Sequence, residues 1–279
     1  PADLSVTAGV GTSNQKLELN DRFNTALATR PDKFEKKYTG MVSPHLALNK
    51  VFAKRFSVWA SYSKGYKAPV ASYFYITTPA VATTPPTPAT GFVNQDLKPE
   101  IGNQFEIGTR GELLHGNLFY ELSVYNLVFS NKMTAVTVAS PLQPNTTLYA
   151  YVVNGGKQIH KGLEANLRWV VYESASRFFH MVRPFANYTY ADYTYGDNFT
   201  FQSSPTTKLD YSNKQVAAVP KHAFNAGVDV TMSQGLYANV SYNYRGSMPI
   251  TSVNDYYTES TNLLNAKLGI QQVFGKHWG

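Results

Sequence analysis

The sequence is poor in charged residues and has no long apolar run. Of its 279 residues, 25 are Lys or Arg and 18 are Asp or Glu, or 15% of the chain, against about 25% in soluble globular domains. A membrane-spanning helix needs about 20 consecutive apolar residues. The longest runs here, such as 167–172 with its internal Arg168, are far shorter, so a helical membrane protein is excluded. Collagen-like and coiled-coil chains are also excluded, because Gly and Pro follow no fixed period and no heptad is sustained.

Cysteine is absent as well. This fits a bacterial envelope protein that crosses an oxidising compartment, although cytosolic proteins also lack cysteine. The formal net charge is +7, but no long basic run offers a patch to a polyanion, and the densest segment, 33–37, contains Glu35. We therefore expect no nucleic-acid partner. No signal peptide is visible and the chain begins Pro1-Ala2-Asp3, so we expect it to come from the interior of a longer polypeptide.

Aromatic residues and a period of two are the features that the chain does have. Tyr, Phe and Trp make up 14% of the residues. In segment 236–245 the even positions are mostly apolar or aromatic and most odd positions are polar, and segments 224–231, 163–171 and 56–63 alternate in the same way. This pattern is typical of strands that are wet on one face and apolar on the other.

We predict ten strands, with boundaries that err by a few residues. The short connections include Ala53-Lys54, His115-Gly116, 174–176 and 233–235, and they alternate with long ones, so that all long loops lie at one end. The Pro/Thr-rich centre of one long loop, 83–88, is expected to be extended. The predicted strands lie near residues 2–11, 41–52, 55–64, 100–113, 117–130, 148–172, 181–195, 219–232, 236–246 and 261–274.

The unequal loop lengths favour an outer-membrane barrel over a soluble sandwich. Such barrels have short periplasmic turns and long extracellular loops, and lipid cannot hydrogen-bond a peptide group, so a closed ladder of strands is needed to cross it. We therefore predict an all-β fold, an antiparallel transmembrane β-barrel. Aromatic residues near strand ends would form its interfacial girdles: Tyr62, Tyr66, Trp169, Tyr172, Tyr188, Tyr190, Tyr193 and Tyr244.

Four strings, in this order, carry a resemblance to a known family. They are Tyr62-Ser-Lys-Gly-Tyr-Lys-Ala-Pro69, Leu97-Lys-Pro-Glu-Ile-Gly-Asn-Gln-Phe-Glu-Ile-Gly108, Asn154-Gly-Gly-Lys-Gln-Ile-His-Lys-Gly-Leu-Glu164 and Val219-Pro-Lys-His-Ala-Phe-Asn225. Each is weak alone, but together they resemble successive landmarks of the TonB-dependent outer-membrane receptors. The charged residues in and near these strings are expected on the barrel interior: Glu100, Glu106, Arg110, Glu164 and Arg168.

The resemblance implies a barrel of about 22 strands with an N-terminal plug. Residues 1–279 would then be a partial barrel domain, about strands 11 to 20, without the plug and without the last strands. The implied location is the bacterial outer membrane. The implied partners are outer-membrane lipid, a ferric siderophore, and TonB with its inner-membrane energy-coupling proteins, which would act through the plug.

The long loops carry the candidate ligand-binding residues. Aromatic rings and a cation suit a large, anionic, partly aromatic iron chelate, although loop packing is the stronger explanation for any single one of these aromatic residues. No His, Cys or Asp cluster has metal-ligand spacing, so we expect no protein metal site and no cofactor. The candidate residues are Tyr66, Tyr73, Tyr75, Phe92, Tyr211, Arg245, Tyr256 and Tyr257.

Several alternatives stay open from the sequence. The same scaffold serves cobalamin, haem and oligosaccharide uptake, although the absence of histidine between Pro69 and Asn94 disfavours haem. A passive porin or an attachment barrel would share the alternation. An outer-membrane protease would need a carboxylate pair with an Asp/His couple at the outer rim, and only His45 and His222 approach it, so we predict no enzyme.

Overall fold

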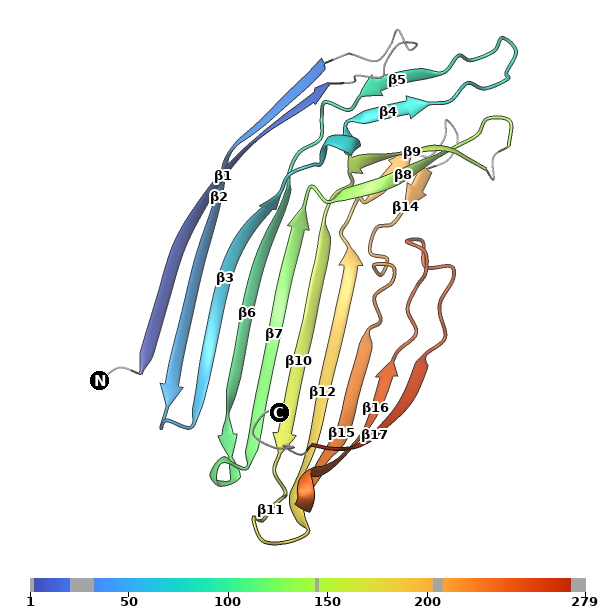
Figure 1. Cartoon of the computed structure of the whole chain (residues 1–279). Helices are drawn as coiled ribbons and strands as arrows, with labels where there is room; N and C mark the ends of the chain where they lie inside the picture. The colour runs from blue at the N-terminus through green and yellow to red at the C-terminus, as the bar shows by residue number, and fades with distance from the viewer. Residues whose placement is uncertain (1–2, 21–32, 144–145, 203–207, 272–279) are drawn as a thin grey trace, which may run out of the picture.

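The computed structural model describes residues 3–20, 33–143, 146–202 and 208–271, and these are almost entirely β-structure. They form one antiparallel sheet in the order β1-β2-β3-β6-β7-β10-β12-β15-β16-β17, with β11 (Tyr172–Glu173) paired to β12 (Figure 1). No helix in this part of the chain has the length and apolarity to cross a membrane. The long strands are β1 (Leu4–Asn20), β2 (Lys33–Phe52), β3 (Phe56–Lys67), β6 (Glu100–Leu113), β7 (Leu118–Ser130), β10 (Gln158–Trp169), β12 (Phe179–Tyr195), β15 (His222–Met232), β16 (Leu236–Arg245) and β17 (Thr261–Ile270).

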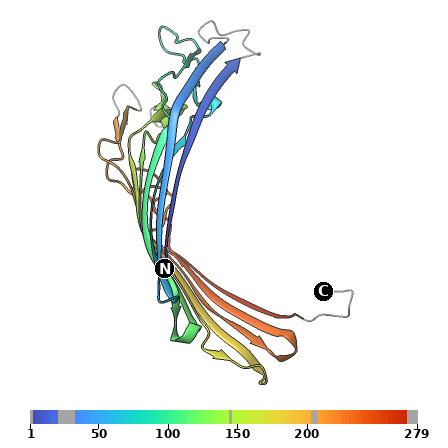
Figure 2. The same ribbon diagram turned by 90° about the vertical axis from the view of Figure 1, so that its left-hand side faces the viewer.

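The sheet is strongly curved, as expected for a section of barrel wall (Figure 2). Its concave face is turned to the viewer in Figure 1, and β15, β16 and β17 curve toward that side. The fold class predicted from the sequence is therefore confirmed: the chain forms an all-β, antiparallel partial barrel.

The ten predicted strands are all present, with two corrections. First, the long loop expected from Thr12 is largely strand, because β1 and β2 stay paired up to Asn20 and Lys33. A bulge in β2 at Thr39-Gly40, opposite Asn14, hides this from the sequence: it reverses the alternation of faces in β2 beyond it, and Gly40 takes a φ of +71°.

The second correction concerns the strand predicted over 148–172. It is divided into β9 (Thr147–Asn154) and β10, because β9 pairs with β8 (Met133–Ala139) in a separate hairpin above the sheet. The break falls at Gly155-Gly156, where Gly156 has a φ of +123° that side chains rarely adopt.

Connections at the two ends of the sheet differ as predicted. The lower end in Figure 1 has the tight turn at 53–55, η2 (Leu114–Gly116), η3 (Ser233–Gly235) and the turn near β11. The upper end carries the long connections, which include η1 (Ala71–Tyr73) and three hairpins. Besides β8–β9 these are β4 (Tyr75–Thr78) with β5 (Thr90–Val93) and β13 (Thr200–Gln202) with β14 (Lys208–Asp210).

The Pro/Thr-rich segment 83–88 is not extended, which corrects the prediction. Val81 and Thr87 pair as an antiparallel bridge, so the chain reverses direction between them, and the Thr84–Pro85 peptide bond is cis. The Thr83 hydroxyl donates to the Pro85 carbonyl at 2.8 Å. A local side-chain hydrogen bond of this kind competes with extended structure.

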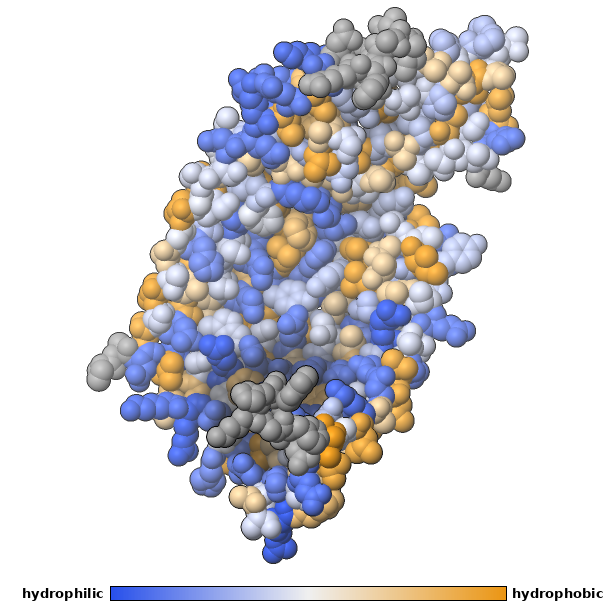
Figure 3. Space-filling view, in the orientation of Figure 1, coloured by the Kyte–Doolittle hydropathy of each residue, from blue (hydrophilic) through white to orange (hydrophobic). Residues whose placement is uncertain are grey.

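The two faces of the sheet have opposite character. Apolar side chains stand exposed on the convex face: Val240 is 43% exposed and Leu268 75%. On the concave face Asn239, Ser241 and Asn243 alternate with them, and Figure 3 shows this face as largely hydrophilic over the middle of the sheet. Expected interior charges such as Glu106 and Glu164 share this polar face. A convex face with exposed hydrocarbon suits lipid, and a polar concave face suits a water-filled interior.

One residue of the expected girdle lies on the other face. The Tyr193 ring stacks on His160 with ring centres 4.0 Å apart, and its hydroxyl is 2.8 Å from that of Tyr125. Tyr193 is therefore part of the concave wall. Tyr188 and Tyr190 lie on the opposite face and contact His222, as girdle residues should.

Candidate functional site

A groove of about 470 Å³, which we call the amide groove, lies at the upper end of the concave face, across β12, β15, β16 and β17. Its floor is a ladder of amides. Asn187 donates to Asn225 at 3.4 Å, and Asn225 donates to Asn243 at 2.5 Å. The three asparagines come from three strands and are direct cross-strand partners, so the register alone aligns them. The rest of the lining is more apolar and consists of Thr189, Ala223, Phe224, Tyr244, Arg245, Thr261 and Leu263.

The groove can bind an oxygen-rich anion. Each amide has two donor hydrogens and an acceptor oxygen, and the ladder uses only part of this capacity. Arg245 is exposed at the rim, where its planar guanidinium can donate two parallel hydrogen bonds to a carboxylate or a similar group. Below the groove, Arg183 is paired with Asp229 at 2.9 Å, so that arginine is already occupied.

A second hollow of about 480 Å³ lies at the upper end of β3, β6 and β7. The charged side chains in this hollow, Glu100 and Lys132, already have partners within the protein. Glu100 is 3% exposed, accepts the Met133 N–H at 2.7 Å and lies 3.4 Å from the Lys132 ammonium. Lys132 also stands over the Phe129 ring at 4.8 Å. This arrangement fixes the connection after β7 to the wall, so we regard Glu100 as a structural residue.

The Asn154 side chain joins two of the sequence strings through three hydrogen bonds, which we call the Asn154 clasp. It accepts the Lys98 N–H at 2.7 Å and donates to the carbonyls of Lys98 and Asn131 at 2.9 and 2.8 Å. The Tyr38 hydroxyl adds a bond to the Leu97 carbonyl at 2.6 Å. The resemblance strings at 97–108 and 154–164 therefore meet at the upper rim, and the contact holds the loops in place.

The loops above the sheet contain small hydrophobic cores of their own. Phe199 is fully buried between the β8–β9 hairpin and the start of the β13–β14 segment, together with Val136 and Tyr195. Tyr211 packs on Tyr195 with ring centres 5.6 Å apart, and burial raises the pKa of its phenol. These loops are therefore packed, and Tyr211 contributes to the packing.

The connection between β16 and β17 presents two tyrosines on a rigid base. Tyr256 is 67% exposed and Tyr257 51%. Beneath them, the Asn254 side chain accepts the Gln215 N–H at 2.7 Å and donates to the Gln215 carbonyl at 2.8 Å. Exposed aromatic rings on a fixed backbone offer binding area at a small entropic cost.

The residues predicted as ligand contacts do not share one pocket. Arg245 lines the amide groove, and Tyr66 lines the hollow beside Glu100. Phe92 lines a third cavity of about 560 Å³ between the β4–β5 and β8–β9 hairpins. Tyr73 packs against the core formed by Tyr38, Met41, Phe74 and Leu97, and Tyr75 begins β4.

Sequence reasoning missed the asparagine ladder. The only signal was that Asn225 and Asn243 occupy polar positions of alternating strands, which is also the pattern of any wet face. The three asparagines are adjacent because β12, β15 and β16 pair in the register that places Asn187, Asn225 and Asn243 opposite one another. Local sequence does not specify that register. Within the described ranges, no three His, Cys, Asp or Glu side chains gather as metal ligands.

Comparison with known proteins gives a consistent family match. A family model described as TonB dependent receptor-like, beta-barrel, matches residues 1–278. No curated protein matches the chain in sequence.

Solved structures show the same fold at low identity. The ferric yersiniabactin uptake receptor FyuA from Yersinia pestis has a TM-score of 0.60 and 16% identity, over 96% of this chain and 36% of that one. The siderophore receptor PiuA from Acinetobacter baumannii has a TM-score of 0.65 and 16% identity, over 95% of this chain and 34% of that one. The copper transporter OprC has a TM-score of 0.67 and 10% identity, over 96% of this chain and 37% of that one. The chain thus spans about a third of the length of these structures.

Proposed function

Because this chain belongs to the TonB-dependent receptor β-barrel family, we propose that it is part of a receptor that binds and imports ferric siderophores. The family is located in the bacterial outer membrane, and its members are transporters, which sets the enzyme interpretation aside. FyuA and PiuA are named as siderophore receptors, which supports the ligand class. OprC is named as a copper transporter, so the fold alone does not choose the ligand.

The observation that carries the proposal is the amide groove with Arg245 at its rim. Many siderophores bind iron through oxygen atoms, and such a chelate presents oxygens and often a net negative charge to its surroundings. Asn187, Asn225 and Asn243 offer hydrogen bonds to those oxygens, and Arg245 offers the charge. The groove faces the concave side, toward which a transported ligand would pass.

The energy for import would come from outside these residues. We propose that TonB and its inner-membrane partners act through a plug that is not among residues 1–279. Ligand binding at the loops and the groove would then be the step to which this chain contributes.

Uptake by a deletion strain tests the proposal. The strain would be complemented with the full-length receptor and supplied with labelled iron as catecholate, hydroxamate or carboxylate chelates, with a copper chelate and labelled cobalamin as further arms. Receptor-dependent uptake of one or more iron chelates is expected. Unchanged iron uptake in every arm, or uptake of copper or cobalamin alone, would contradict the siderophore assignment.

Replacement of Arg245 tests the site. We expect Arg245→Gln to weaken binding of the accepted chelate about tenfold, since one charge-assisted contact contributes about 1.4 kcal/mol or more. Arg177→Gln is the matched control, because Arg177 lies at the opposite end of the sheet beside Phe178. Binding would be measured as the chelate concentration that half-saturates whole cells at matched receptor levels. Equal affinities for the two variants would remove Arg245 from the site.

A further inference from the structure

The asparagines of the amide groove belong to a longer polar row that crosses six strands of the concave face. Each residue of this row is the direct cross-strand partner of the next, on β6, β7, β10, β12, β15 and β16 in turn. The row therefore follows from the register of the sheet. We call it the amide track, and its members are Arg110, Glu121, Asn166, Asn187, Asn225 and Asn243.

The amide track leads from one rim of the wall to the other. Arg110 lies three residues from the lower end of β6, and Asn243 lies two residues from the upper end of β16. Barrel strands are tilted by about 35–45°, so a row perpendicular to them climbs the wall diagonally. Five strand spacings of about 4.8 Å give the track a length of roughly 24 Å. The track thus joins the amide groove to the lower rim.

Asn166 is the step of the track that follows the groove. It is exposed and does not line the groove, and its side chain has no hydrogen-bond partner among the described residues. An asparagine amide offers two donor hydrogens and an acceptor oxygen. Asn166 is therefore available to a ligand that leaves Asn187, its neighbour on β12.

The charges around Asn166 balance one another. Along β10 it lies between Glu164 and Arg168, and across the sheet Glu121 and then Arg110 follow it. None of these four charged side chains forms an ion pair in the part of the chain that the structure describes. Because two positive and two negative groups cancel, hydrogen bonds would hold a ligand here with little help from charge. Such weak, repeated contacts suit conduction, since a ligand must leave each site as easily as it enters.

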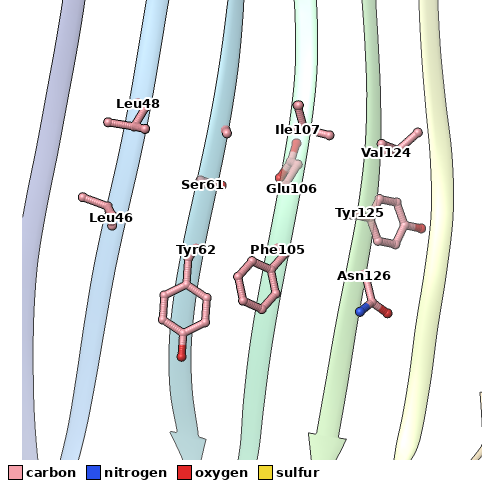
Figure 4. Close-up of a pocket in the computed structure, with 11 residues that line it drawn as sticks. Leu46, Leu48, Ser61, Tyr62, Phe105, Glu106, Ile107, Val124, Tyr125 and Asn126 are labelled. Atoms are coloured by element: carbon pink, nitrogen blue, oxygen red, sulfur yellow. The ribbon is translucent and has the colours of Figure 1, made fainter.

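The convex side of the same part of the sheet is apolar. Figure 4 shows a pocket there over β2, β3, β6 and β7, lined mainly by apolar and aromatic side chains such as Leu46, Tyr62 and Phe105. Successive side chains of a strand point to opposite faces, which separates the two environments. A polar ligand that moves along this wall therefore keeps its hydrogen-bond partners on the concave side.

We propose that the amide track is the route along which an imported, oxygen-rich ligand moves from the amide groove to the lower rim. Amides about 4.8 Å apart let the ligand bond to the next strand before it releases the last one, so its polar groups are not left unpaired at any step. The proposal rests on the import function proposed above, but not on which ligand is imported. It assigns Asn166 to transfer and not to first binding.

Separate measurement of surface binding and of internalisation tests the proposal in the full-length receptor. Cells without metabolic energy are loaded with the labelled chelate that the wild type takes up in the uptake test above, and energy is then restored. We expect Asn166→Leu, which keeps the size of the side chain and removes its amide, to internalise bound ligand at least fivefold more slowly. The concentration that half-saturates surface binding should stay within about twofold of the wild-type value.

Two further variants separate transfer from structure. Asn166→Gln keeps an amide and should restore at least half of the wild-type rate. Asn265→Leu is the matched control, because Asn265 is an exposed residue of the concave face outside the track, and its rate should equal that of the wild type. All variants are compared at matched levels of heat-modifiable receptor.

Three results would overturn the proposal. They are equal rates for Asn166→Leu and Asn265→Leu, a rate in Asn166→Gln as slow as in Asn166→Leu, and a loss of surface affinity in Asn166→Leu that accounts for its slower uptake. If the wild type takes up copper or cobalamin alone, the siderophore assignment fails, and the same three results decide the track with that ligand as probe.

Discussion

At the residue scale, glycine on the concave face makes room for a ring from the neighbouring strand. Gly162 is the direct cross-strand partner of Tyr125, and a Cβ added to it would lie 2.3 Å from the Tyr125 hydroxyl and 2.7 Å from the Tyr190 carbonyl. Rings lie over facing glycines in this way at several points, which also eases the bending of the sheet. The further pairs are Trp59 with Gly108, Phe185 with Gly227, and Tyr237 with Gly269.

Replacement of Gly162 by alanine should therefore destabilise the barrel. We expect a loss of about 1–3 kcal/mol, because the methyl group must displace Tyr125 and the backbone at Tyr190 cannot yield cheaply. The loss would be measured as a shift of the urea midpoint, followed by heat-modifiable mobility of the full-length protein. Gly65→Ala is the control, since nothing lies within 4 Å of the added Cβ there. Equal midpoints for the two variants would contradict the packing argument.

The Asn154 clasp gives a second prediction at this scale. Asn154→Ala removes three hydrogen bonds at the rim and leaves the Lys98 N–H without its acceptor. We expect a local cost of about 1–3 kcal/mol and faster amide exchange of Lys98 by hydrogen–deuterium exchange. Asn117→Ala, at the exposed turn after η2, should leave that amide unchanged. Protection of Lys98 in the Asn154→Ala variant would show that the clasp is dispensable.

At the scale of elements, the upper connections are small packed units and the lower ones are bare turns. The β8–β9 and β13–β14 hairpins share one buried cluster, and the β16–β17 connection is tied to it through the Tyr195 hydroxyl, 2.9 Å from Ser252. Long surface loops are often mobile, but these carry their own apolar contacts. The site above the concave face is thus held largely preformed.

Phe199→Ala should loosen the packing of the upper connections without unfolding the sheet. Phe199 is fully buried, and its truncation in a packed cluster costs about 3–5 kcal/mol. We expect faster tryptic cleavage after Lys208 and Lys214 in the intact receptor, with unchanged heat modifiability of the barrel. Phe92→Ala is the control, because Phe92 is 44% exposed. Cleavage at the wild-type rate in the Phe199→Ala variant would contradict the role of the cluster.

At the scale of the whole molecule, the two faces of the curved sheet determine where each residue type is tolerated. Val240 and Ser241 are neighbours on β16 but point to lipid and to the interior, respectively. We expect Val240→Arg to cost about 2–4 kcal/mol where it meets the membrane midplane, and Ser241→Arg to assemble nearly as well as the wild type. The folded fraction in outer-membrane preparations measures both. Assembly of Val240→Arg at the level of Ser241→Arg would contradict the assignment of faces.

Local sequence patterns were enough to predict the strands, their two faces and the family. The period of two at 224–231 and 236–245 follows from side chains that alternate across a strand, and tight turns such as 233–235 are local in sequence, so both could be read directly. The four strings also pointed to the family that the comparison confirms. The ligand contacts named from the loops remain predictions, since aromatic composition does not distinguish a packed ring from a binding one.

The arrangement of side chains on the concave wall and in the loops could not be predicted, because it depends on contacts that form only in the folded chain. The bulge at Thr39-Gly40 reverses the faces of β2, and a glycine break moved β9 out of the sheet into a loop hairpin. The amide ladder of Asn187, Asn225 and Asn243 and the burial of Tyr211 depend on register and on contacts between segments far apart in the chain. Such contacts are set by the packing of the whole sheet, because no local preference specifies which residue lies opposite which.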